Sequence, residues 1–191
     1  SYDGASDKTR LNFTATNSQH LVADNSFVQG ASSAREFTIF EVSKINNSTQ
    51  NVFGYHYILD GSKISMGINA DGVYEVSVND GVTQLTENTG TLAGNKEINH
   101  IGVLRKSSKT ITLDYYDSQV IYSNHSTDAL FEADMDFNKA QFRIGCITTP
   151  PSSNTNFLDG DVQELITYAR KLTDEEVAQI VGYLNNKYRI Y

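Results

Sequence analysis

The chain has 191 residues, with 15 basic and 23 acidic side chains and a formal net charge of −8. This acidic balance, without any basic run, excludes nucleic acid as a partner and argues against docking on anionic lipid. No stretch approaches 18 consecutive apolar residues, so the sequence predicts no transmembrane span and no membrane insertion.

The composition is typical of an all-β protein. Tyr occurs eleven times and Phe nine times, whereas Pro occurs twice and Trp is missing. Aromatic and β-branched side chains favour pleated, half-buried surfaces, and Asn, Gly and Asp supply the turns between strands. The single cysteine, Cys146, excludes an intramolecular disulfide. It shares the apolar phase of its run with Phe142 and Ile144, so we expect a buried, inert thiol.

Short alternating runs separated by turn residues predict the strands of a two-sheet sandwich. In chain order, the runs are Arg10–Thr14, Gln19–Ala23, Phe37–Ile45, Val52–Leu59, Lys63–Asn69, Val73–Asn79, Ile98–Arg105, Thr110–Tyr116, Gln119–Tyr122, Gln141–Cys146 and Asp161–Tyr168. The dipeptides Asp60-Gly61, Asp71-Gly72 and Asp80-Gly81 suit tight hairpins and predict a meander in the middle of the chain. Loops are expected at Gly30–Ala34, Thr86–Asn95 and Thr148–Asn156.

The alternation within a run predicts which side chains face the core. In Lys63–Asn69, for example, Ile64, Met66 and Ile68 share one face, and polar or small residues share the other. Each strand is therefore expected to have one apolar and one polar face. Two sheets that meet on their apolar faces would leave two polar outer faces.

A single helix is predicted at the C-terminal end, over residues 174–187. Thr173 and Glu176 have the spacing of a capping box, and Asp174 and Glu175 add negative charge at the positive helix end. Apolar residues at helical spacing form one stripe to pack against the sandwich: Val177, Ile180, Val181, Leu184 and Tyr188.

Several segments resemble a known family. They are Leu11-Asn12-Phe13 and Phe37-Thr38-Ile39-Phe40 near the start, Phe142-Arg143-Ile144-Gly145, Phe157–Tyr168, Arg170–Glu176 and Tyr183–Tyr188. Together they resemble the concanavalin A-like lectin/glucanase superfamily, in particular laminin-G-like domains of bacterial and phage surface proteins. Thr14 and Ala15 stand where that family often has an Asp-Gly turn. The resemblance implies an all-β, two-sheet antiparallel jelly-roll sandwich with one C-terminal α-helix. We expect a single domain over residues 1–191, with 1–9 as a linker.

The resemblance also suggests a catalytic alternative. Glucanases of this fold carry three acids on one strand, and Glu132, Asp134 and Asp136 match that spacing, although the last is Asp rather than Glu. The segment lies between predicted strands and lacks the tryptophans of such clefts. An acidic solvated loop is the favoured interpretation, and we expect no catalysis.

Metal binding is a second candidate chemistry. Laminin-G domains and lectins often hold calcium on loops at the sandwich edge, which makes Asp134 and Asp136, or Asp159 and Asp161, candidate calcium ligands. Asp-Gly pairs serve turns equally well, so the structural alternative stays open. The four histidines are scattered without zinc spacing.

Sugar binding is the expected activity. Five residues at outward-facing strand positions are candidate ligand contacts: His56, Arg105, Asp114, Tyr116 and Glu164. Tyr55, Tyr57 and Tyr74 fall on the opposite phase and are expected in the core.

We expect a non-catalytic carbohydrate-binding module at the C-terminal end of a larger extracellular or virion surface protein, such as a fibre or spike. Its partner would be a cell-surface glycan or polysaccharide. The alternatives are a virion decoration or oligomerisation domain that binds other surface-protein subunits, and a β-glucan hydrolase.

Overall fold

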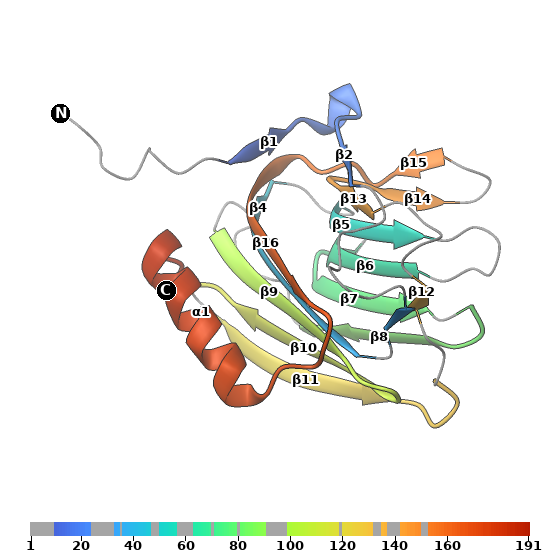
Figure 1. The fold of residues 1–191 in the computed structure, drawn as a ribbon. Coiled ribbons are helices and arrows are strands. Elements are labelled where there is room, and N and C mark those ends of the chain that lie inside the picture. Colours follow the sequence, from blue (N-terminus) through green and yellow to red (C-terminus); the bar gives the residue numbers. More distant parts are fainter. Residues whose placement is uncertain are drawn as a thin grey trace.

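The computed structural model describes residues 10–23, 33–34, 36–46, 50–56, 63–69, 71–79, 81–90, 99–118, 120–131, 135–136, 142–149 and 153–191. Two antiparallel six-stranded sheets lie face to face, and one helix covers the outside of the first sheet (Figure 1). This is the predicted jelly-roll sandwich. Within the described residues, no helix is long and apolar enough to cross a membrane.

The first sheet contains six strands. They follow the order β1 (Leu11–Phe13), β16 (Gly160–Tyr168), β4 (Phe37–Ile45), β9 (Asn99–Lys106), β10 (Thr110–Tyr116) and β11 (Ile121–Thr127). Its register is continuous from β4 to β11, and one irregularity in β16 lies between Val162 and Glu164.

The second sheet also contains six strands. They follow the order β2 (Leu21–Ala23), β13 (Phe142–Ile144), β5 (Gln50–His56), β6 (Lys63–Ile68), β7 (Tyr74–Asn79) and β8 (Gln84–Asn88). The last four are consecutive neighbours, which confirms the predicted meander. At the β6–β7 turn, Gly72 has φ 78°, a left-handed conformation that glycine adopts without strain. Asp60-Gly61 lies outside the described residues.

Two short ribbons complete the strands. β3 (Ser33–Ala34) pairs with β12 (Met135–Asp136), and β14 (Ile147–Thr149) pairs with β15 (Ser153–Thr155). The segment η1 (Ala15–Asn17) is a single 3-10 turn between β1 and β2. The expected loop Thr148–Asn156 therefore contains strand residues at both ends.

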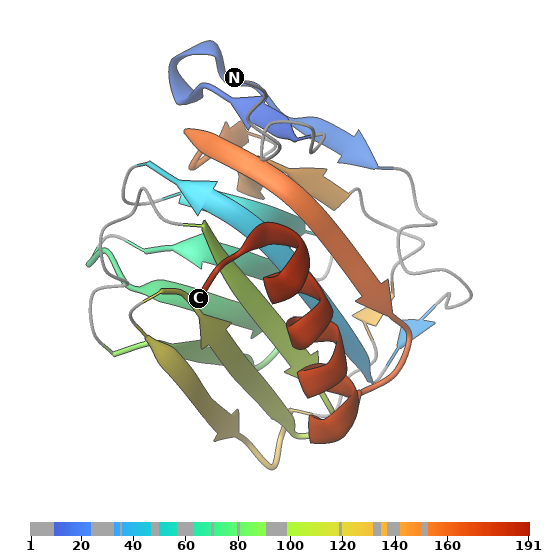
Figure 2. The same cartoon turned by 90° about the vertical axis from the view of Figure 1, so that its left-hand side faces the viewer.

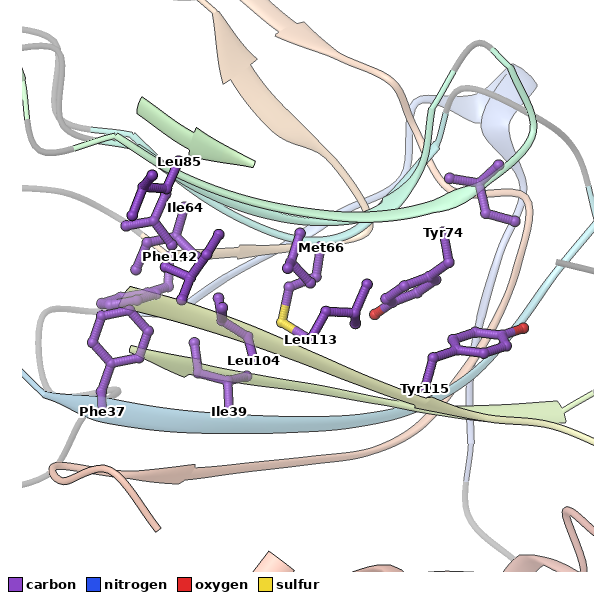
Figure 3. Packing of buried hydrophobic residues seen from close by; sticks show 14 of the residues in the cluster. Phe37, Ile39, Ile64, Met66, Tyr74, Leu85, Leu104, Leu113, Tyr115 and Phe142 are labelled. Atoms are coloured by element: carbon purple, nitrogen blue, oxygen red, sulfur yellow. The ribbon is translucent and has the colours of Figure 1, made fainter. Parts of the chain in front are cut away.

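The main core lies between the two sheets. Figure 3 shows Phe37, Ile39 and Leu104 of the first sheet facing Ile64, Met66 and Leu85 of the second, all buried. Tyr74 and Tyr115 meet across the same interface, with ring centroids 5.0 Å apart. The predicted core position of Tyr74 is confirmed; the side chain of Tyr55 and all of Tyr57 lie outside the described residues.

The helix α1 (Asp174–Tyr188) begins at the predicted residue and ends one residue beyond the predicted end at Lys187. Thr173 accepts a hydrogen bond from the Glu176 backbone, and the Glu176 side chain accepts one from the Thr173 backbone, which confirms the capping box. The helix ends at Arg189, which has a left-handed conformation with φ 55°.

A second apolar layer lies under this helix. Val177, Val181, Leu184 and Tyr188 are buried against outward-facing residues of β4 and β9: Phe40, Val42, Ile101 and Val103. The expectation of a polar outer face on every strand is therefore wrong for β4 and β9. Their sequences are apolar in both phases because both faces of these strands are buried.

Strand β8 lies where a loop was expected from Thr86 onward, and β11 extends to Thr127, beyond the predicted end at Tyr122. These strands carry mostly polar residues, so alternation gave little signal. A carboxylate joins them: Glu87 on β8 accepts hydrogen bonds from Tyr122, Asn124 and Ser126 on β11.

Candidate functional site: a polar groove beside the helix

A groove of about 670 Å³ lies between the outer face of β10–β11 and the start of α1. In Figure 2, the helix crosses the first sheet and leaves these two strands uncovered beside it. The lining residues are Arg105, Thr110, Thr112, Ser123, His125, Thr127, Lys171, Leu172, Thr173, Asp174 and Glu175. The volume is within the usual range for a small-molecule site.

The floor of the groove follows from strand alternation. Residues 111, 113 and 115 of β10 point into the main core, so Thr110 and Thr112 point outward. They pair across the ladder with Thr127 and His125, and the hydroxyl groups of Thr110 and Thr127 are 3.1 Å apart. The floor is consequently rich in hydroxyl groups on rigid strands.

Arg105 joins the floor to the helix wall. Its guanidinium group forms an ion pair with Asp114, 2.9 Å away, and another with Asp174 in the first turn of α1. The hydrogen bond from Arg105 holds the pKa of Asp174 below its usual range. Arg105 is 6% exposed, so its two partners satisfy a charge that would be costly to bury alone.

The charges around the groove are balanced. The described lining contains two cations, Arg105 and Lys171, and two carboxylates, Asp174 and Glu175. The Asp174 side chain is 87% exposed even though it pairs with Arg105. Such a lining suits a ligand with many hydroxyl groups and no net charge.

Four of the five predicted ligand contacts share the outer face of the first sheet: Arg105, Asp114, Tyr116 and Glu164. Arg105 lines the groove, and Asp114 lies directly beside it, accepting a hydrogen bond from Ser123. His56 lies in β5 of the other sheet, so it does not share this face.

Glu164 and Tyr116 also contact the C-terminal segment. The Glu164 carboxylate accepts hydrogen bonds from Lys187 and Tyr188, both at 2.8 Å. The Tyr116 ring stacks on the Tyr191 ring at 6.1 Å. Burial, followed by the charge of Asp114, raises the pKa of Tyr116 to about 12. Glu164 thus fixes the helix against the sheet, and a ligand role for these residues stays a prediction.

The candidate calcium ligands are only partly described. Asp134 lies outside the described residues, as does the side chain of Asp136. Asp161 forms an ion pair with Arg10 at 3.1 Å and accepts a hydrogen bond from Asn12. A guanidinium group beside Asp161 does not fit a calcium site there, and the described residues contain no cluster of three acidic, His or Cys side chains. Asp159 takes part in no such cluster within those residues.

Two groups of residues are candidates for catalysis. Glu132 and Asp134 of the glucanase motif lie outside the described residues. Inside the core, Ser43 and Glu41 both approach Nε2 of His100, at 3.1 and 3.0 Å. A nucleophilic relay needs different partners on the two ring nitrogens of the histidine and needs access for substrate. Here both contacts are to the same nitrogen, and the three residues are at most 3% exposed, so they do not form such a relay.

The buried cluster has a structural role instead. Tyr74 donates a hydrogen bond of 2.6 Å to Glu41, and burial followed by the Glu41 charge raises the pKa of Tyr74 well above its usual value. A Cβ atom on Gly102 would lie 2.1 Å from the Tyr74 hydroxyl oxygen, so glycine is required there. The cluster links the two sheets through polar groups.

Thr112, Ser123, His125 and Thr127 of the groove floor were not among the predicted contacts. The polar run of β11 was the available signal, but its extent as a strand was not predicted. Without that strand, the cross-strand pairs that bring these side chains together cannot be derived.

No protein-family model matches the chain, and no curated protein matches its sequence. Solved structures do match. The CBM40 of Ruminococcus gnavus IT-sialidase is 13% identical with a TM-score of 0.61, over 84% of this chain and 97% of that one. Domains LG4-5 of the mouse laminin alpha1 chain are 10% identical with a TM-score of 0.67, over 92% and 46%.

NanB sialidase from Streptococcus pneumoniae matches at 14% identity and a TM-score of 0.64 over 88% of this chain. The chain spans 27% of the length of that sialidase. At identities this low, the structural match establishes the fold and leaves the function open. The chain has the concanavalin A-like jelly-roll fold.

Proposed function

We propose that the chain is a non-catalytic recognition module that binds a neutral glycan in the groove beside α1. The observation that carries this proposal is the lining: a hydroxyl-rich floor on two rigid strands, with balanced charges around the groove. Sugar hydroxyl groups both donate and accept hydrogen bonds, as do the Thr and Ser side chains of the floor.

The charge arrangement supports a neutral ligand over an acidic one. The guanidinium group of Arg105 is already paired with Asp114 and Asp174, so a sugar carboxylate that binds to Arg105 would have to compete with these ion pairs. The exposed carboxylate of Asp174 would also repel an anion at the rim.

The comparisons support glycan recognition in general. The Ruminococcus gnavus CBM40, which matches over nearly its full length, has been solved bound to α2,3- and α2,6-sialyllactose. By analogy of fold, we propose that this chain is the glycan-binding part of a larger extracellular or virion surface protein.

The test is a glycan array followed by titration calorimetry with lactose and sialyllactose. The double variant Thr112→Val/His125→Ala removes floor groups without altering the core, and Gln84→Ala, at an exposed position of β8 in the other sheet, is the control. We expect at least tenfold weaker binding for the double variant and unchanged binding for the control. An array without hits contradicts glycan binding. Preference for sialyllactose over lactose would contradict the argument for a neutral ligand, but not glycan binding itself.

Exposed apolar residues favour a second candidate function, contact with another protein subunit. In the described residues, β1 and β2 each have one neighbouring strand, and Leu11, Leu21 and Val22 on them are 40–46% exposed. Open strand edges with apolar side chains favour pairing with another chain. Light scattering of the wild type and Val22→Lys tests this: a stable oligomer that the substitution dissociates supports it, and a monomeric wild type contradicts it.

A further inference from the structure

The outer face of β10–β11 ends in an aromatic platform away from the groove. Tyr116 on β10 pairs across the ladder with Ile121 on β11, and the Tyr191 ring stacks on Tyr116 with an interplanar angle of 23°. Ile121 is 69% exposed and Tyr191 is 50% exposed. Exposed rings of this kind provide a flat apolar surface with polar edges.

This platform is held in place. The backbone N–H groups of Ile190 and Tyr191 donate hydrogen bonds of 3.0 and 2.9 Å to Asn185 near the end of α1. Tyrosine has few rotatable bonds, so an anchored tyrosine contacts a ligand at a low cost in conformational entropy.

The platform and the groove lie on one continuous face. Thr112 in the groove and Tyr116 are four positions apart on β10, a distance of about 13 Å along the strand. The floor between them carries the hydrogen-bonded pair Asp114 and Ser123. A single sugar ring cannot span this distance, whereas an oligosaccharide can.

The helix runs beside the whole of this face. Its first residue, Asp174, contacts Arg105 at the groove, and Asn185 near its end holds Tyr191 at the platform. Ala178 and Gly182 fall between them on the same side of the helix by helical spacing. A Cβ atom on Gly182 would meet no described atom within 4 Å, so the wall is open at this point.

We propose that the groove is one end of an extended site, and that the stacked pair Tyr116–Tyr191 is a second subsite that takes a further ring of a neutral oligosaccharide. This inference rests on the proposed glycan binding. The second ring stacks its C–H face on the exposed tyrosine surface. The helix forms one wall of a channel that joins the groove to this surface. Two linked subsites bind a linked ligand more tightly than either subsite binds its own ring, because the second contact is intramolecular.

The test measures how binding depends on glycan length. Wild type and variants are compared on an array of neutral glycans from monosaccharides to hexasaccharides, followed by calorimetry on the neutral hits. We expect wild type to bind the longer hits at least tenfold more tightly than the monosaccharides. Tyr191→Ala, which removes the exposed ring of the stacked pair, and Gly182→Trp, which fills the channel, should lose this advantage.

Two matched controls separate this site from general effects. Tyr183→Ala removes another helix-borne tyrosine that is 53% exposed, and Gly182→Ala keeps the channel open. Both should bind like wild type, with helix content checked by circular dichroism. Equal binding of short and long glycans, or an equal loss in Tyr183→Ala, overturns the second subsite but not glycan binding. An array without any hit overturns the proposed function itself.

Discussion

The seam between β8 and β11 allows a quantitative test of the fold next to the groove. Glu87 is 9% exposed, and its carboxylate accepts three side-chain hydrogen bonds from β11: from Tyr122 and Asn124 at 3.1 Å and from Ser126 at 2.6 Å. Glu87→Met keeps the length of the side chain and removes all three. A buried donor that loses its partner costs about 1–3 kcal/mol. Because these donors can reach water, we expect about 1 kcal/mol for each bond, or about 3 kcal/mol of unfolding free energy in total.

Glu87→Gln is the matched control. Its amide oxygen can accept from Tyr122 and Asn124, and its amide group can donate to the Ser126 hydroxyl, so only the assistance of the charge is lost. We expect this variant to lose about 1 kcal/mol.

Urea denaturation, followed by circular dichroism and extrapolated linearly, measures both variants. A double-mutant cycle with Ser126→Ala isolates the shortest bond, because that substitution should cost less in the Glu87→Met background. Glu87→Met within 0.5 kcal/mol of wild type, or equal to Glu87→Gln, would refute the role of these hydrogen bonds.

Further predictions concern the helix and the cysteine. The Arg170 hydrogen bonds lower the folded pKa of Glu176 from 4.5 to about 2. The stabilising contribution of Glu176 is therefore complete above pH 4.5 and is lost as the pH falls toward 2. Acid titrations of wild type and Glu176→Gln should differ in this pH range. Gly182→Ala should raise the unfolding free energy by about 0.5–1 kcal/mol. Leu184→Ala should lower it by about 2–5 kcal/mol, and equal melting curves would contradict its burial. Burial raises the pKa of Cys146 to about 11, so Ellman's reagent should label it slowly in the native protein and rapidly in urea.

Much of the fold could be predicted because its signals are local. The Asp71-Gly72 turn, the Thr173 capping box and the alternation in β6 depend on neighbouring residues, and all three predictions are confirmed. The face on which the helix packs depends on contacts far apart in sequence. β4 carries apolar residues on both faces, with Phe37 on one and Phe40 on the other, and this was the local signal of that packing.

The candidate site was less predictable for the same reason. Arg105 and Asp114 were placed on a common face from alternation, and the register of β9 and β10 brings them together. The second partner of Arg105, Asp174, comes from the helix across 69 residues of chain, and strand phase carries no information about such a contact. His125 belongs to a strand that polar composition concealed.

The unequal covering of the first sheet has a consequence for sequence divergence. β4 and β9 are packed on both faces, so most substitutions there lower stability and are selected against. The outward positions of β10 and β11, such as Thr112 and His125, contribute little to either apolar layer. Mutations at these positions can change the proposed binding site while the sandwich stays intact, so the same two strands are a natural location for a randomised library that selects for ligand binding.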